Sequence, residues 1–266
     1  MLSMPRVVAL YRYPVKGFTP ESCERLTVLE NGRIAGDRAL AFRFGDSPLP
    51  EEEWSRKHGF AVLVNTPALA RLSLRFDQEA RRLRIGLDGQ LLADEALDDA
   101  GRRRLEAVVE QFVLGVPENP LIDHPERRPL RLIGDGITPR YQDSRDGQTT
   151  LHSRESLAAV GAALHDPGVD EARFRSNIAI EGVQAWEEQD WIGRRVRIGG
   201  VELDVVRPKT RCLATHANPR TGERDRRVMQ TLVAAFAQQE PTFAVALMTH
   251  GRGGEIRVGD AVELVA

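Results

Sequence analysis

Apolar residues in the first hundred positions recur in short runs that are separated by turn residues. Alternation of apolar and polar residues with period two predicts strands at residues 72–76 and 83–87, and short apolar runs predict strands at 6–12, 25–29 and 39–44. Asp88-Gly89 favours a hairpin that leads into a run at Leu91 and Leu92. Many short strands with turns between them are typical of a barrel or a sandwich.

Helical spacing first appears after this region. Apolar side chains three or four positions apart predict an amphipathic helix over residues 98–114, formed around Leu105, Val108, Val109, Phe112 and Val113. The helix is ended by Gly115-Val116-Pro117. Residues 117–150 are rich in Pro, Asp, Arg and Gly, so we place a domain boundary here and expect domains at 1–116 and 117–266.

The second half returns to strands and adds two helices. Ser153 is a candidate N-cap for a helix that carries Leu157, Val160 and Leu164, and a second helix is predicted near 229–236. Strands are expected at 174–180, 196–198, 201–205, 211–215, 243–248 and 255–265, with Gly199-Gly200 as a hairpin turn. The predicted fold class is mainly β with peripheral helices, an α+β arrangement.

Composition narrows the function classes. The formal charge of −2 argues against a globally basic nucleic-acid binder, and no nucleic-acid polymer is expected as a partner. Two cysteines, Cys23 and Cys212, are too few for a four-cysteine zinc site or iron–sulfur cluster. No apolar run approaches ~18 residues, so no membrane partner is expected. The first residues lack the layout of a secretory signal, which predicts a cytoplasmic location.

Cys212 is the strongest candidate for chemistry, since Walker-loop, dinucleotide, nucleophile-elbow and zinc-protease motifs are absent from the sequence. Three cations, Arg207, Lys209 and Arg211, lie within five residues of it. Positive charge stabilises a thiolate, which is a nucleophile and a soft-metal ligand. The alternative is a buried structural cysteine. His216 is either half of a Cys/His metal pair or a solvated loop histidine.

Further basic and polar residues lie beside predicted turns. Lysine and arginine at strand ends suit phosphate, so these side chains could converge on an anionic ligand, although a single residue of this kind is more often a solvated surface charge. The residues are Lys16, Arg38, Arg173, Arg175 and Asn177, together with Ser153.

Five motifs in order carry a family resemblance. The sequence resembles the MOSC-domain proteins, which are related to the C-terminal domain of molybdenum cofactor sulfurase. It is most similar to the two-domain branch that includes the mitochondrial amidoxime-reducing component and bacterial relatives. The motifs are Tyr13-Pro14-Val15-Lys16-Gly17, Gly36-Asp37-Arg38, Arg173-Phe174-Arg175-Ser176-Asn177-Ile178, Thr210-Arg211-Cys212-Leu213-Ala214-Thr215 and Ile256-Arg257-Val258-Gly259-Asp260-Ala261-Val262.

The resemblance implies a fold, a cofactor and a site. It implies an N-terminal β-barrel domain followed by a MOSC β-barrel domain, and a molybdenum cofactor, a pterin with a dithiolene and a terminal phosphate. Carried over by motif, Cys212 would be the catalytic residue and the molybdenum ligand. Lys16 and Arg38 would hold the phosphate, with the backbone N–H of Gly17, which stands where relatives commonly have serine. The residues that would line the pterin are Ser153, Arg175, Asn177, Thr210 and Arg211.

The function implied is reduction of small N-hydroxylated compounds. With two cysteines and no cluster of its own, the protein would need an external electron donor, a flavin or iron–sulfur protein. The alternative is a carrier or storage module for the cofactor or its sulfur, with Cys212 as a persulfide or transient ligand. A third possibility is a protein that binds another anion. The relation to the sulfurase also implies pyridoxal phosphate binding. Asn218 replaces an aspartate that is common in relatives.

Overall fold

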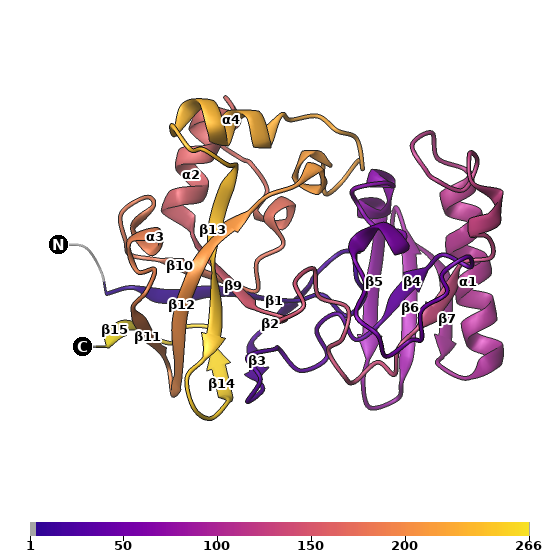
Figure 1. The fold of residues 1–266 in the computed structure, drawn as a ribbon, viewed down its shortest axis with the longest axis horizontal. Coiled ribbons are helices and arrows are strands. Elements are labelled where there is room, and N and C mark those ends of the chain that lie inside the picture. Colours follow the sequence, from indigo (N-terminus) through magenta and orange to yellow (C-terminus); the bar gives the residue numbers. More distant parts are fainter. Residues whose placement is uncertain (1–3, 266) are drawn as a thin grey trace.

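The computed structural model describes residues 4–265, so Met1–Ser3, on which the expectation of no secretory signal partly rests, lie outside it. The chain is mainly β with few helices and forms two lobes (Figure 1). The strands of the first half are β1 (Arg6–Arg12), β2 (Glu21–Cys23), β3 (Arg25–Val28), β4 (Ala41–Arg43), β5 (Leu72–Asp77), β6 (Arg82–Leu87) and β7 (Gln90–Ala96). The later strands are β8 (Arg131–Ile133), β9 (Thr149–Ser153), β10 (Ile178–Glu181), β11 (Arg195–Ile198), β12 (Val201–Thr210), β13 (Thr242–Thr249), β14 (Gly254–Arg257) and β15 (Val262–Val265).

The larger lobe is built on one mixed sheet that joins the two ends of the chain. Its strand order is β15-β11-β12-β13-β9-β10-β1-β2, and β9 and β10 form its parallel pair. Strand β1 pairs antiparallel with β10. The first strand of the chain is therefore hydrogen-bonded to a strand from the second half. Valines, isoleucines and leucines of these strands form one buried core.

The closed β-barrels that the resemblance implied are not confirmed. The large sheet begins at β15 and ends at β2, and these two strands are not paired with each other in the described part of the chain. An isolated bridge from Arg6 to Ala261 and a hydrogen bond from Val7 N to Asp260 O at 2.9 Å bring the ends near each other. One bridge does not make a continuous ladder, so the sheet is curled and open.

The smaller lobe contains the hairpins of the first half. Strands β5, β6 and β7 form a meander and β4 pairs with β8, while α1 (Asp99–Leu114) packs beside β7 and β8. The lobe has its own core, which runs from Val15 to Leu132 and includes Leu105, Val109 and Val113 from one face of α1. The division into domains at residues 1–116 and 117–266 stays a prediction.

Short helices cover one end of the large sheet. These are α2 (Arg154–Ala163), α3 (Glu187–Asp190) and α4 (Val228–Ala235). Helix α2 packs on β9 and β10, α4 packs on β13, and the two helices contact each other (Figure 1). Ser153 is the N-cap of α2 as predicted, because its side chain accepts a hydrogen bond from Ser156 N. Among residues 4–265, no helix combines the length and the hydropathy that crossing a membrane requires.

One predicted strand is wrong. Residues 211–215 do not form a strand, since β12 ends at Thr210 and residues Leu213–His216 form a short 3-10 turn that begins after Cys212. The chain therefore leaves the sheet immediately before the cysteine. The thiol of Cys212 therefore lies just beyond the end of β12 and outside the hydrogen-bonded part of the sheet.

Candidate functional site

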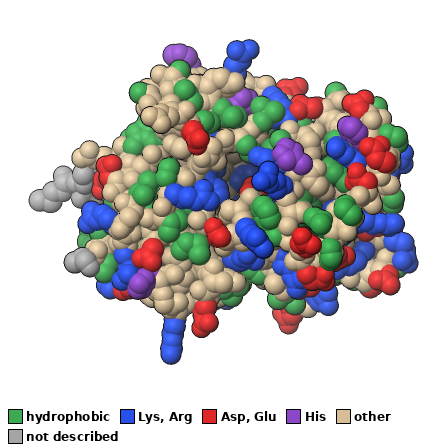
Figure 2. Space-filling model, viewed as in Figure 1, with side chains coloured by type: hydrophobic (Ala, Val, Ile, Leu, Met, Phe, Trp, Pro, Cys, Tyr) green, Lys and Arg blue, Asp and Glu red, His purple; other side chains and the backbone are tan. Residues whose placement is uncertain are grey.

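A cationic pocket lies between the two lobes. Its volume is about 260 Å³, and Figure 2 shows a hollow near the middle of this face with lysine and arginine side chains at its rim. Seven of the lining residues are cationic and one is a carboxylate, Asp143. The lining cations are Arg38, Lys57, Arg173, Arg175, Arg207, Lys209 and Arg211.

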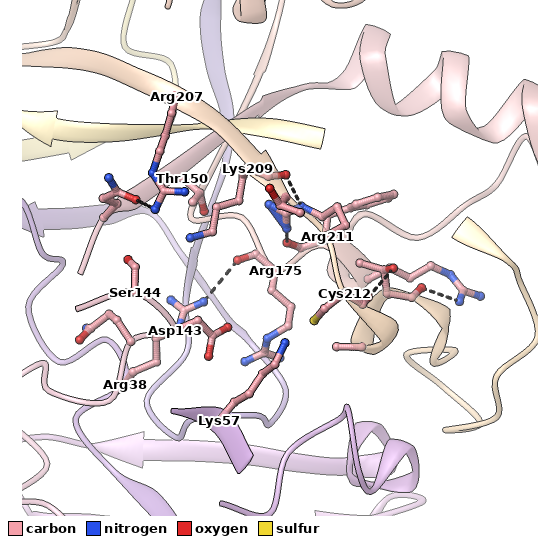
Figure 3. A pocket seen from close by; sticks show the side chains of 17 residues that line it. Arg38, Lys57, Asp143, Ser144, Thr150, Arg175, Arg207, Lys209, Arg211 and Cys212 are labelled. Atoms are coloured by element: carbon pink, nitrogen blue, oxygen red, sulfur yellow. Dashed lines mark hydrogen bonds between the residues drawn. The ribbon is translucent and has the colours of Figure 1, made fainter. Parts of the chain in front are cut away.

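Cys212 lies in the wall of this cationic pocket, next to the end of β12 (Figure 3). It is a free, half-buried cysteine, and its carbonyl accepts hydrogen bonds from Thr215 N and Oγ1, both at 3.0 Å. The 3-10 turn thus fixes the backbone of the cysteine while the thiol stays accessible from the pocket. Thr210 and Arg211 line the same pocket.

Two arginines from distant motifs meet on the ring of Tyr13. The guanidinium carbons of Arg38 and Arg175 lie 4.6 and 4.4 Å from the ring centroid. Both residues have left-handed backbones, with φ of 51° and 53°, a conformation that is strained for side chains other than glycine. The motif that contains Tyr13 is joined directly to the motif that contains Arg38, because Tyr13 N donates to Asp37 Oδ1 at 2.8 Å. Cation–π contact with one buried ring thus holds two like charges side by side.

Lys16 and Gly17 line a smaller hollow that shares Arg38, Arg175 and Cys212 with the cationic pocket. Lys16 is 2% exposed, and its Nζ donates to Asp143 Oδ1 at 2.6 Å and to Tyr141 O at 2.9 Å. Burial lowers the pKa of Lys16 although Asp143 opposes the shift. Asp143 is 59% exposed at its side chain and compensates the charge of Lys16 from the loop between β8 and β9.

The charges next to the cysteine are poorly compensated. Burial, followed by repulsion from Arg211, lowers the pKa of Lys209 to about 8. Burial also lowers the pKa of Arg211 to about 10, against the attraction of Cys212. Arg211 Nη2 is buried without a hydrogen-bond partner in the described chain. A buried donor of this kind is costly unless an acceptor meets it, so the pocket fits an anionic ligand beside the thiol.

Ser153 and Asn177 do not line the cationic pocket. Ser153 is fully buried and its Oγ donates to Glu188 Oε2 at 2.9 Å. Asn177 is buried immediately before β10, which lies between β9 and β1; its Nδ2 donates to Tyr11 O at 3.1 Å and its Oδ1 accepts from Thr150 N at 3.3 Å. Both side chains hold the framework behind the pocket, and neither has a polar group left for a ligand in this arrangement.

Steric packing explains why position 17 is a glycine. Its φ is +82°, and a Cβ there would lie 2.6 Å from Val62 Cγ1 and 2.8 Å from Val62 Cα. Such contacts are shorter than packed atoms allow, and the left-handed backbone adds strain for any L side chain. Glycine is therefore required at this position by the packing of the Lys16 loop on Val62.

Gly17→Ser is expected to destabilise the protein by about 3 kcal/mol, from left-handed strain and from the clash with Val62. Gly89→Ser is the matched control, since Gly89 has φ of +83° and nothing within 4 Å of its Cβ position. We expect about 1 kcal/mol there, from strain alone. Urea unfolding of both variants measures the difference, and equal losses would contradict the role of Val62.

Two further sequence hypotheses are resolved by the geometry. His216 is buried rather than solvated, and its Nε2 accepts from Met229 N at 3.2 Å in the first turn of α4. No group of three or more His, Cys, Asp or Glu side chains with metal-site geometry occurs in the described range 4–265. Asn218 is not among the pocket residues; its Nδ2 donates to Asp225 Oδ2 at 2.7 Å, where an aspartate would repel.

Several pocket residues were not predicted as site residues from the sequence. The cations Arg207 and Lys209 were visible only as charges near Cys212, and Lys57 as one of several polar residues in a loop. Asp143, Gln148 and Thr150 fall in the segment 134–150, which the sequence predicts only as a loop over the site, and they come from the loop after β8 and the start of β9. Their approach to β12 depends on the long-range pairing of β9 with β13.

The fold and the pocket define a mainly β protein that presents one cysteine in a cationic cleft between two lobes. Residues 138–263 of the chain match the family model described as MOSC domain. The chain is 26% identical to mitochondrial amidoxime-reducing component 1 of Homo sapiens, over 97% of this chain and 82% of that protein. It is 29% identical to molybdenum cofactor sulfurase of Anopheles gambiae, over 87% of this chain.

The chain spans about a third of that sulfurase, 33% of its length. The YUAD protein from Bacillus subtilis aligns over 98% of this chain and 96% of its own, with a TM-score of 0.44 and 11% identity. The names of the amidoxime-reducing component and the sulfurase connect these relatives with amidoxime reduction and with the molybdenum cofactor.

Proposed function

We propose that this protein binds a molybdenum cofactor in the cationic pocket and reduces N-hydroxylated compounds with electrons from a separate protein. The observation that carries the proposal is the position of Cys212 in one pocket with Arg38, Arg175 and Arg211, which come from three distant segments. An accessible thiolate is a soft ligand suited to molybdenum, and the surrounding cations suit an anionic pterin phosphate. The unpartnered Nη2 of Arg211 is a donor that such a ligand would satisfy.

Different residues would bind different parts of the cofactor. Cys212 would hold the metal, and Arg38 and Arg175, with Lys16 behind them, would meet the phosphate. Arg211 and Thr210 would contact the pterin side of the pocket, and the two lobes would limit water around it. Ser153 would act indirectly by fixing the start of α2, and Asn177 by linking β1 and β9 at the start of β10.

The reaction balances as a two-electron reduction. The cofactor supplies the oxygen-atom transfer that cleaves the N–O bond. An N-hydroxyl compound takes up two electrons and two protons, the N–O bond breaks, and an amine or amidine and water are formed. The electrons come from a flavin or iron–sulfur protein, since the two cysteines of this chain cannot hold a cluster. Pyridoxal phosphate binding and a cytoplasmic location stay predictions and play no part in this proposal.

The direct test is metal analysis followed by turnover. The full chain is purified from a host that makes the molybdenum cofactor, and molybdenum and the fluorescence of the oxidised pterin are measured per chain. Benzamidoxime is then supplied with a reduced viologen, and benzamidine is quantified. Near-stoichiometric molybdenum with turnover supports the reductase. Molybdenum that is released to an acceptor protein without turnover supports the carrier, and absence of metal and pterin from a cofactor-replete preparation contradicts both.

A further inference from the structure

Three cations at the end of β12 and just beyond it lack a carboxylate partner in the described chain. Arg207 donates to the amide oxygen of Gln148 at 2.6 Å, and Arg211 donates to backbone carbonyls. Lys209 Nζ makes no hydrogen bond or ion pair with residues 4–265, and its side chain points into the pocket in Figure 3. We call Arg207, Lys209 and Arg211 the β12 triplet.

Two cations on the other side of the pocket region do have carboxylate partners. Lys16 is paired with Asp143, and Arg38 is paired with Asp37. Lys57 and Arg175 also line the pocket without a carboxylate partner in the described chain, so the β12 triplet supplies three of its five unpaired cations, next to Cys212. The pKa of Lys209 is lowered to about 8 because burial and then repulsion from Arg211 oppose its charge more strongly than Asp143 stabilises it.

The β12 triplet also runs from solvent toward the thiol. Arg207 is exposed, Lys209 is half-buried and Arg211 is buried immediately before Cys212. Residues 207 and 209 are two positions apart on β12 and both line the pocket, so one ligand can meet both side chains. The hydroxyl of Ser144 adds a neutral donor on the same pocket, while the hydroxyls of Thr150 and Thr210 donate to Asn177 Oδ1 and Glu240 Oε2. Such a row of cations favours a carboxylate or phosphate.

We propose that the substrates of this protein are anionic, and that Lys209 and Arg207 bind a carboxylate or phosphate group of the substrate while the N-hydroxyl group lies near Cys212. This inference rests on the proposed reductase function and names its substrate class. The β12 triplet selects by charge, because a neutral substrate leaves the ammonium of Lys209 without an acceptor.

The test compares benzamidoxime with 4-carboxybenzamidoxime, which differ by one carboxylate. Binding to the molybdenum-loaded full chain is measured by calorimetry without reductant, so that no turnover occurs, and KM is measured separately with a reduced viologen. We expect the carboxylate to improve both by about 10-fold or more, an effect that weakens with added salt. Lys209→Met should reduce this preference to about 2-fold or less, and Arg207→Met should reduce it by about 3-fold.

Arg252→Met is the matched control. Arg252 is exposed in the turn before β14, and its substitution removes one positive charge, as Lys209→Met does. It should leave the carboxylate preference unchanged. Equal binding of the two compounds by the parent protein, or an equal loss in Arg252→Met, would overturn the inference. Loss of bound molybdenum and pterin in Lys209→Met, with the carboxylate preference retained, would assign the β12 triplet to the cofactor and also overturn it.

Failure of the inference and failure of the reductase function can be told apart. If both compounds are reduced with equal KM, the reductase stands and the anionic substrate class is wrong. If neither compound is reduced but the carboxylate still binds through Lys209, the reductase function is wrong and the anion site stands.

Discussion

Cys212→Ser is expected to lower bound molybdenum and N-hydroxy reduction by about 100-fold or more. A serine hydroxyl is a hard donor that stays protonated near neutral pH, so it cannot replace a thiolate on a soft metal. Metal analysis and pterin fluorescence on purified protein measure the loss. The effect should be specific to the pocket, because the side chains of serine and cysteine are similar in size.

Cys23→Ser provides the control for this substitution. Cys23 is half-buried on β2, its Sγ lies 3.7 Å from Glu21 O, and it is not among the pocket residues. Its replacement should leave molybdenum and turnover unchanged. Full metal retention and turnover in Cys212→Ser would contradict the assignment of this thiol as the ligand.

Arg173→Met is expected to destabilise the protein by about 3–5 kcal/mol. Arg173 is 4% exposed; its Nη1 donates to His216 O and Ala217 O, both at 3.1 Å, and its Nη2 donates to Asp225 Oδ1 at 2.7 Å. Removing the guanidinium leaves a carboxylate and two carbonyls short of a partner. The segment concerned follows Cys212 directly, so molybdenum retention should fall as well.

Asp225→Asn separates the two contributions of this ion pair. Burial alone would raise the pKa of Asp225, but hydrogen bonds from Asn218 and Arg173 outweigh it and hold the pKa below its ordinary value. An amide keeps one acceptor for Arg173, so we expect a smaller loss, about 1–2 kcal/mol. Urea unfolding measures both variants. A loss below about 1 kcal/mol in Arg173→Met would show that water replaces its contacts.

Local patterns predicted the elements that local physics decides. The period of apolar residues located α1 to within one residue, and Asp88-Gly89 marked the hairpin between β6 and β7. Strand β8 was missed inside the region predicted as a loop, since three residues are too few to show a period and β8 exists by pairing with β4. The pairing of β1 with β10 was equally invisible, because it joins segments far apart in the sequence.

The site was predicted in part, and by resemblance more than by pattern. The motifs around Lys16, Arg38, Arg175 and Cys212 do converge in space. Ser153 shows what the sequence cannot distinguish. A hydroxyl that caps a helix and one that contacts a ligand look alike in the sequence until the structure shows that Glu188, 35 positions away, accepts its hydrogen bond. Sequence patterns also could not show which cations carry partners, and that depends on the Asp143 loop.

The position of β1 in the large sheet limits how this protein can be divided. The family match starts at residue 138, yet a fragment that begins there would lose β1 and β2 and expose the edge of β10. An unpaired edge of buried residues is a template for aggregation. Such a fragment should therefore be poorly soluble, and any shuffling of the C-terminal half between proteins would have to carry the first strands of the chain with it.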